Sequence, residues 1–201
     1  MAGSKQGETK AMTADTPPGE AVDTLEQRLA GFRPAPVHLW NPDARGVIDI
    51  VIDQNGGWHH EGRPIARPAL VRLFASVLRR EPDGSYVLVT PQEKLAITVA
   101  DAPFVAVDLA EDTGGDPPAL VFSTNVGEVV RLDAQHPLRI NGSGGAPFVP
   151  YILVRPGIEA RLTRAVAGDL AARAQARDGR FGVVSAGHFF VIGDDCWADD
   201  A

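Results

Sequence analysis

Apolar and polar side chains alternate from Ile48 to Asp53, where three isoleucines occupy every second position. Successive side chains of a strand point to opposite faces, so this alternation predicts a strand with one apolar face. Asn55-Gly56 follows, a pair typical of tight hairpin turns because both central positions need a positive φ. We therefore expect a second short strand to return through Trp58.

A helical period replaces the alternation after Pro68. Proline is favoured at the first position of a helix, and the apolar residues that follow recur at three- and four-residue steps, which places them on one helical face. These residues are Leu70, Val71, Leu73, Phe74, Val77 and Leu78. The pattern predicts an amphipathic helix whose polar face carries Arg72, Arg79 and Arg80.

From Gly84 onward the apolar residues alternate again, between clusters of Pro, Gly, Asp and Asn that are typical of turns. The pattern predicts seven short strands, at 86–90, 95–99, 104–109, 120–124, 128–132, 138–140 and 151–154. Apolar residues at four-residue steps then predict a helix over about 158–177. The segment 178–193 predicts a closing hairpin.

Two parts of the chain share one apolar pattern. Three apolar residues of the first predicted helix recur 92 positions later in the second, and each helix precedes an Asp-Gly pair and a hairpin. The matching sets are Leu70, Phe74, Leu78 and Leu162, Val166, Leu170. We interpret the match as a duplicated helix–hairpin unit; the alternative is a chance similarity of apolar patterns.

Seven consecutive strands followed by one amphipathic helix is the element order of a pleckstrin-homology-like barrel. The sequence therefore predicts an α+β protein in three parts: a disordered leader at 1–20, a small N-terminal α+β domain at 21–82, and a pleckstrin-homology-like antiparallel barrel with a C-terminal helix at 83–201. The leader is rich in Gly, Thr, Pro and charge. It leaves open whether Met1 or Met12 is the start.

Composition narrows the partners and the compartment. The 201 residues carry a net charge of −7, which argues against nucleic acid or an anionic membrane as a partner because both attract cationic faces. A single cysteine, Cys196, cannot form an internal disulfide. No apolar run approaches the roughly 20 residues of a membrane span, and the N-terminus has no signal-peptide core. We expect a cytoplasmic protein.

Few motifs indicate catalysis or metal binding. On a strand, His59 and Glu61 would share a face while His60 points away, which leaves fewer ligands than zinc needs. The loop NGSGGAP lacks the Gly-Lys-Ser/Thr ending of a phosphate loop. Cys196 lies among aspartates, the wrong electrostatic setting for a nucleophilic thiolate. We expect no catalytic residue, no metal and no cofactor.

Several segments between Val37 and Ile192 resemble a known family. They are VHLWNP, RPALVRLFASVLRR, DGSYVLVTPQEKLAITVADAPFVAVD, STNVGEVV and HPLRI, and they are similar to a proteobacterial family called domain of unknown function 1285. The resemblance implies a duplicated α+β fold with a pleckstrin-homology-like C-terminal part. It also implies a site for a small, nucleotide-like ligand between two domains, and a signalling role. It carries over no catalytic residue.

Two cations are the main candidates for holding an anion. Lys94 is the only lysine after residue 10 and lies in the predicted turn TPQEK, while Arg67 precedes Pro68 at a predicted helix N-terminus, where backbone N–H groups favour anions. Each has a simpler interpretation as a surface ion pair, with Glu93 in the case of Lys94. Further candidates, which turn or strand-edge roles explain equally well, are Thr124, Asn125, His136 and Arg139.

The sequence therefore predicts a non-enzymatic ligand-sensing or signalling protein. It would bind a small anionic, nucleotide-like ligand between its two domains, with Arg67 and Lys94 converging on the ligand. Two alternatives stay open: a protein–protein interaction module without a small ligand, and an enzyme with an unrecognised site. The turn that holds Lys94 has no net positive charge, so we expect no lipid binding.

Overall fold

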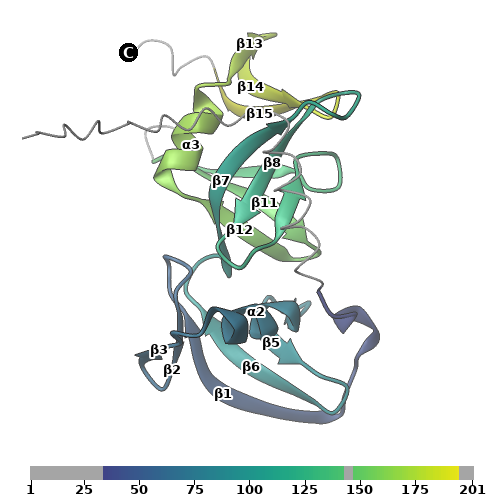
Figure 1. Cartoon of the computed structure of the whole chain (residues 1–201), viewed down its shortest axis with the longest axis vertical. Helices are drawn as coiled ribbons and strands as arrows, with labels where there is room; N and C mark the ends of the chain where they lie inside the picture. The colour runs from purple at the N-terminus through teal and green to yellow at the C-terminus, as the bar shows by residue number, and fades with distance from the viewer. Residues whose placement is uncertain (1–33, 143–146, 195–201) are drawn as a thin grey trace, which may run out of the picture.

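A computed structural model describes residues 34–142 and 147–194. Within these ranges the chain forms fifteen β-strands, two α-helices and one short 3-10 helix, so the protein is mostly β and the expected α+β class is wrong. The strands form three sheets that follow one another along the long axis of the molecule (Figure 1).

The leader expected at 1–20 and Cys196 lie outside the described residues. Neither α-helix is long and apolar enough to cross a bilayer.

The first sheet follows the 3-10 helix η1 (Val37–Leu39) and contains six strands. They are β1 (Ala44–Ile52), β2 (Trp58–His60), β3 (Arg63–Pro64), β4 (Leu78–Arg80), β5 (Tyr86–Val89) and β6 (Glu93–Val99), in the order β3-β2-β1-β6-β5-β4. Neighbours are antiparallel except the central pair, β1 and β6, which is parallel. The strands at 86–99, which we expected in a domain beginning at residue 83, complete this N-terminal sheet.

The predicted hairpin at Asn55-Gly56 is confirmed, and Asp53 shows why it forms. Asp53 Oδ1 accepts hydrogen bonds from the backbone N–H groups of Asn55 (2.7 Å) and Gly57 (3.0 Å), and Gly56 has a φ of 76°. The bond from Gly57 lowers the pKa of Asp53 most. The bond with His59 Nε2 (2.9 Å) lowers the same pKa further. His59 therefore helps to close the turn between β1 and β2.

Helix α2 (Pro68–Ser76) begins at the predicted proline but ends before the last residues of the predicted apolar stripe. Leu78 instead begins β4 and is buried there. Within the helix Ala75 is fully buried, and the Phe74 ring stacks on Trp58 of β2 with 6.2 Å between ring centroids. These side chains hold α2 against the first sheet.

The second sheet also contains six strands. They are β7 (Phe104–Asp112), β8 (Ala119–Thr124), β9 (Val129–Arg131), β10 (Leu138–Asn141), β11 (Val149–Arg155) and β12 (Ile158–Leu162), in the order β10-β11-β12-β7-β8-β9. Its central pair, β12 and β7, is parallel. In both large sheets the first and the last strand along the chain are therefore the parallel neighbours at the centre.

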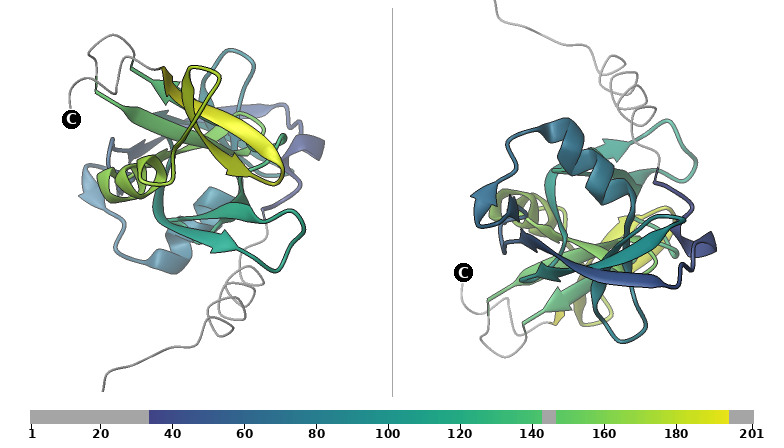
Figure 2. Two further views of the ribbon diagram at one scale, coloured as in Figure 1. Left: turned by 90° about the horizontal axis from the view of Figure 1, so that it is seen from above. Right: turned by 90° about the horizontal axis from the view of Figure 1, so that it is seen from below.

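A small third sheet follows helix α3 (Arg164–Ala171). Its strands are β13 (Gln175–Arg177), β14 (Arg180–Ser185) and β15 (His188–Asp194), in chain order. The predicted closing hairpin is confirmed as β14 and β15, which are antiparallel. Viewed along the long axis, these yellow strands lie across the green strands of the second sheet (Figure 2). The buried Ser185 hydroxyl joins the two sheets, because it donates to Leu132 O (2.6 Å) and accepts from Leu120 N (2.8 Å).

The long second helix predicted over 158–177 is wrong. Residues 158–162 form β12, with Ile158, Ala160 and Leu162 buried and the residues between them half-buried. Only 164–171 is helical, and Thr163 caps this helix by accepting a hydrogen bond from Val166 N (3.3 Å). The error has a simple cause: the same apolar residues fit both a four-residue step and an alternation, and pairing with β7 selects the strand.

The duplicated helix–hairpin unit and the pleckstrin-homology-like barrel are wrong as well. In the apolar match, Leu78 and Leu162 lie in strands rather than helices, so the two sets do not occupy equivalent helical faces. The second sheet is not an antiparallel barrel, because β7 and β12 are parallel. Helix α3 is not the closing element either, since three strands follow it.

The two large sheets share one continuous core and a buried charged contact. Ile50 of β1 belongs to the same buried cluster as Phe104 of β7. Arg155, at the end of β11, donates from Nη2 to Ala75 O in α2 (2.8 Å), and the same nitrogen lies 3.0 Å from Glu128 Oε1. The Arg155 and Glu128 side chains are only 13% and 8% exposed. The charged pair therefore lies where α2 meets the second sheet.

The environment of Glu128 disfavours its charged form. Burial raises the pKa of Glu128 to about 7, although the nearby Arg155 guanidinium opposes this effect. Oε1 has no hydrogen-bond partner despite its short distance to Arg155, so the pair is an ion pair without hydrogen-bond alignment. Burial also lowers the pKa of Arg155.

Candidate ligand-binding pocket

Lys94 is not in a turn. It lies in β6, its side chain is buried, and its Nζ donates to Glu81 Oε2 at 2.6 Å. Arg79 binds the other oxygen of Glu81 from Nε (2.7 Å) and also donates to the carbonyls of Val37 and Trp40. Burial alone would raise the pKa of Glu81, but the bonds from Lys94 and Arg79 outweigh it and lower the pKa. Lys94 therefore binds the carboxylate that holds Arg79, the residue that anchors the segment around η1.

Arg67 is exposed at the N-cap of α2, where its carbonyl accepts from Leu70 N and Val71 N. Among the described residues no hydrogen bond or ion pair joins it to Lys94. The cleft in which the two cations would converge on one anion stays a prediction.

Thr124 and Asn125 have structural contacts in the turn between β8 and β9. Thr124 Oγ1 accepts from Glu128 N (2.9 Å). Asn125 Oδ1 accepts from Val105 N (3.0 Å), and its Nδ2 donates to Gly56 O (3.0 Å) in the β1–β2 turn. Asn125 therefore connects the first sheet to the second.

His136 and Arg139 are also engaged within the protein. His136 Nδ1 lies 3.0 Å from Asp133 Oδ1. Arg139 forms two hydrogen bonds with the Glu159 carboxylate (2.8 and 2.7 Å), and its guanidinium lies over the Tyr151 ring at 4.0 Å. The structure thus gives an internal partner to each of these two candidates. Over residues 34–142 and 147–194, no three His, Cys, Asp or Glu side chains gather as a metal site would require.

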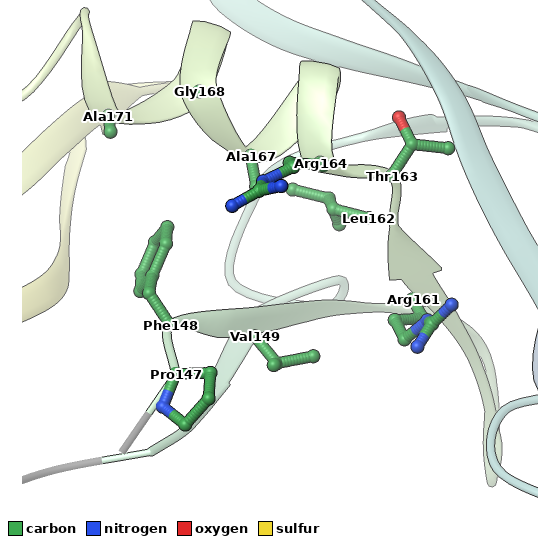
Figure 3. A pocket seen from close by; sticks show the side chains of 10 residues that line it. All are labelled: Pro147, Phe148, Val149, Arg161, Leu162, Thr163, Arg164, Ala167, Gly168 and Ala171. Carbon is green, nitrogen blue, oxygen red and sulfur yellow. The ribbon is translucent and has the colours of Figure 1, made fainter. Parts of the chain in front are cut away.

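A cavity of about 600 Å³ lies between α3 and the adjoining ends of β11 and β12 (Figure 3). Its walls are mostly apolar, and its polar side chains are Arg161, Thr163 and Arg164. The apolar or small lining residues are Pro147, Phe148, Val149, Leu162, Ala167, Gly168 and Ala171. A volume of this size is typical of pockets for small organic ligands.

Local sequence explains the position and the width of this cavity. The antiparallel pairing of β11 and β12 sets Arg161 opposite Tyr151, and Thr163 then turns the chain into α3. Beyond Arg164, the face that α3 presents to the cavity carries only the small residues Ala167, Gly168 and Ala171. A Cβ added at Gly168 would meet no atom within 4 Å, so this face leaves open space.

The two arginines of the cavity are only partly neutralised. Arg161 Nε lies 3.6 Å from Asp101 Oδ2, too far for a hydrogen bond, and this buried nitrogen has no hydrogen-bond partner. Asp101 instead accepts from Tyr151 Oη at 3.0 and 3.2 Å. Arg164 is exposed and forms no ion pair with any described residue. Two available guanidinium groups beside apolar walls can bind an anion.

This pair was not predicted from the sequence, because one continuous helix was expected over about 158–177, a range that contains both residues. The RLTR segment matches no binding motif. Only the strand–cap–helix boundary at Thr163, set by the sheet, brings the two side chains to one cavity.

Comparison with protein families separates the chain at the junction between its two large sheets. The family described as "Domain of unknown function (DUF1285), N-terminal domain" matches residues 35–102, and "Protein of unknown function (DUF1285), C-terminal domain" matches 103–192. The chain belongs to the DUF1285 family. The predicted resemblance is confirmed. No functionally curated protein matches the chain.

Two solved DUF1285 structures are similar to the chain. A DUF1285 family protein from Silicibacter pomeroyi DSS-3 is 40% identical, with a TM-score of 0.76, over 87% of this chain and 97% of that one. A DUF1285 family protein from Shewanella baltica OS155 is 28% identical, with a TM-score of 0.48, over 59% of this chain and 87% of that one. This DUF1285 protein thus has bacterial relatives, and their descriptions assign no activity.

Proposed function

We propose that this DUF1285 protein is a non-enzymatic sensor that binds a small anionic ligand in the α3 cavity. The observation that carries the proposal is a pair of arginines, Arg161 and Arg164, that line one largely apolar cavity, with Arg164 in no ion pair among the described residues. Arg161 is paired only with Asp101, at 3.6 Å, and no hydrogen bond within the described residues engages its guanidinium, so its other N–H groups can donate to an anion. This site differs from the expected one between the two domains.

The lining favours binding over chemistry. Guanidinium groups stay protonated at all physiological pH values, so they hold anions but do not transfer protons. The Thr163 hydroxyl accepts the capping bond from Val166 N and has only its O–H left to donate to a ligand. Each charge-assisted hydrogen bond to a ligand is worth about 1.5–3 kcal/mol, and two such bonds can select an anion against a neutral analogue.

The position of Arg161 supports a sensing role. Asp101, its neighbour at 3.6 Å, lies in the short segment between β6 and β7, where the first sheet ends and the second begins. A ligand that draws the guanidinium away from Asp101 would change the charge balance at that junction. Ligand binding in the cavity would in this way act on the segment that joins the two sheets.

Thermal-shift measurements with inorganic phosphate, ATP and octanoate test the proposal, because a ligand that binds only the folded state raises the Tm. Arg161→Ala and Arg164→Ala should each weaken the binding of an anion by roughly ten- to a hundred-fold. Arg67→Ala is the matched control, since it removes an exposed arginine at the other candidate site. An anion that depends on Arg67 and not on Arg161 would refute the site; turnover of a substrate would refute the non-enzymatic role.

A further inference from the structure

The α3 cavity has two unlike ends. Arg161 and Thr163 lie at one end, the Arg164 guanidinium lies near the middle, and Phe148, Pro147 and Ala171 lie at the other end (Figure 3). Charge therefore extends from one end to the middle of the cavity, and the wall at the other end is apolar. A ligand that fills it needs a matching separation between a charged head and an uncharged body.

The volume of the cavity is much larger than a bare inorganic anion. Useful pockets for organic ligands span roughly 300–1,000 Å³, and the cavity of about 600 Å³ lies in the middle of that range. A phosphate ion between the arginines would leave the apolar walls in contact with water. Covering those walls is favourable in proportion to the apolar area removed from water.

The scarcity of polar groups argues against a nucleobase as the body of the ligand. The edges of a base carry donors and acceptors that need partners when buried. Beyond the two arginines the lining offers one polar side chain, Thr163, whose hydroxyl accepts the capping bond of α3 and has a single O–H left to donate. A hydrocarbon body has no such requirement.

The small side chains of α3 define the shape of that body. Ala167 and Ala171 lie on either side of Gly168, where even a methyl group would touch nothing within 4 Å. Glycine in the middle of a helix weakens the helix relative to alanine. Its position here keeps the cavity open along the helix for a slender chain.

We infer that the ligand is an amphipathic anion, with a carboxylate or phosphate head at Arg161 and Arg164 and an unbranched hydrocarbon body along Gly168. This inference rests on the proposed function and names the chemical class of its ligand. Head and body then contribute separately: the head gives selection for charge, and the body gives affinity that grows with chain length.

A chain-length series measured by calorimetry tests the inference on the whole chain. The dissociation constants of hexanoate, octanoate and decanoate, all kept below their micelle concentrations, should fall about fourfold for each added methylene. Octanol should bind at least tenfold more weakly than octanoate, because it lacks the charge. Gly168→Leu should weaken decanoate binding by about tenfold or more by filling the cavity. Ala165→Leu, an exposed position of α3 outside the lining, should leave binding unchanged.

The outcomes separate the inference from the proposed function. Phosphate or ATP binding that depends on Arg161, together with affinities that do not vary with chain length, would overturn the amphipathic ligand and leave the anion site intact. Failure of every probe to bind would overturn both. If Gly168→Leu does not fold, as judged by circular dichroism, Ala171→Leu narrows the same wall, and the chain-length series needs no variant at all.

Discussion

At the scale of single residues, the structure gives a different role to the lysine that the sequence singled out. Lys94 is buried against Glu81, and Glu81 is bound by Arg79 from the other side. Glu81 thus lies between two cations, and each of them binds one of its carboxylate oxygens. The rarity of lysine in this chain marks a structural ion pair and does not by itself indicate a ligand site.

Replacing Lys94 should therefore lower stability. Lys94→Ala leaves the largely buried Glu81 carboxylate with Arg79 alone, and we expect a loss of about 1–3 kcal/mol in the free energy of unfolding. Urea denaturation measures the loss. Arg67→Ala, which removes an exposed cation, should change the free energy of unfolding much less. A stable Lys94→Ala protein that has lost affinity for phosphate would instead make Lys94 a ligand residue.

At the scale of elements, Ser185 fastens the third sheet to the second. Its hydroxyl is fully buried and bridges Leu120 N and Leu132 O, so removing it leaves a backbone donor and a backbone acceptor without a partner. This bridge adds to the backbone bond from Ala186 N to Pro118 O (2.9 Å) and to the buried Val183 and Ile192, which also dock the β14–β15 hairpin.

We expect Ser185→Ala to destabilise the protein by about 2 kcal/mol. Amide hydrogen exchange should rise in β14 and β15 more than in β1, because the loss is local to the third sheet. Ser123→Ala in β8 is the matched control, since the Ser123 hydroxyl makes no hydrogen bond within the described residues. An equal loss of stability in both variants would show that the bridge contributes nothing specific.

Element type could be predicted from sequence where the local pattern has one solution. The alternation at Ile48–Ile52 and the turn at Asn55-Gly56 each correspond to a confirmed element. The segment from Ile158 to Leu162 fits two periods, and only pairing with β7 decides between them. Arg161 was missed for the same reason, because its place at the cavity depends on that strand. The pairing of β12 with β7 joins segments far apart in the sequence, so no local pattern of residues predicts it.

At the scale of the whole molecule, the buried pair of Arg155 and Glu128 makes the contact between α2 and the second sheet sensitive to protons. Folding holds the Glu128 carboxyl where its pKa is about 7, whereas the ordinary value is 4.5. Between these two values the folded protein binds a proton at Glu128 that the unfolded chain has released. Glu128 therefore contributes stability below pH 4.5 that is lost as the pH rises through 7.

The free energy of unfolding should fall by up to roughly 3 kcal/mol more in the native protein than in Glu128→Gln as the pH rises from 4.5 to 7.5. Above that range the two curves should run parallel. Urea denaturation at several pH values gives both curves, and Glu111→Gln, at an exposed position, controls for the loss of an ordinary carboxylate. Parallel curves throughout would mean that Glu128 titrates normally and that water reaches the contact.

The parallel pair at the centre of each large sheet also sets an order for folding during synthesis. As the chain leaves the ribosome, β1 has an unpaired edge until β6 emerges some fifty residues later, and β7 waits in the same way for β12. Pairings of such separation close slowly, and an exposed strand edge is prone to wrong association meanwhile. Because β6 ends before β7 begins, the first sheet can close while the second is still being synthesised. The two sheets therefore have an exposed central strand edge one after the other and not at the same time.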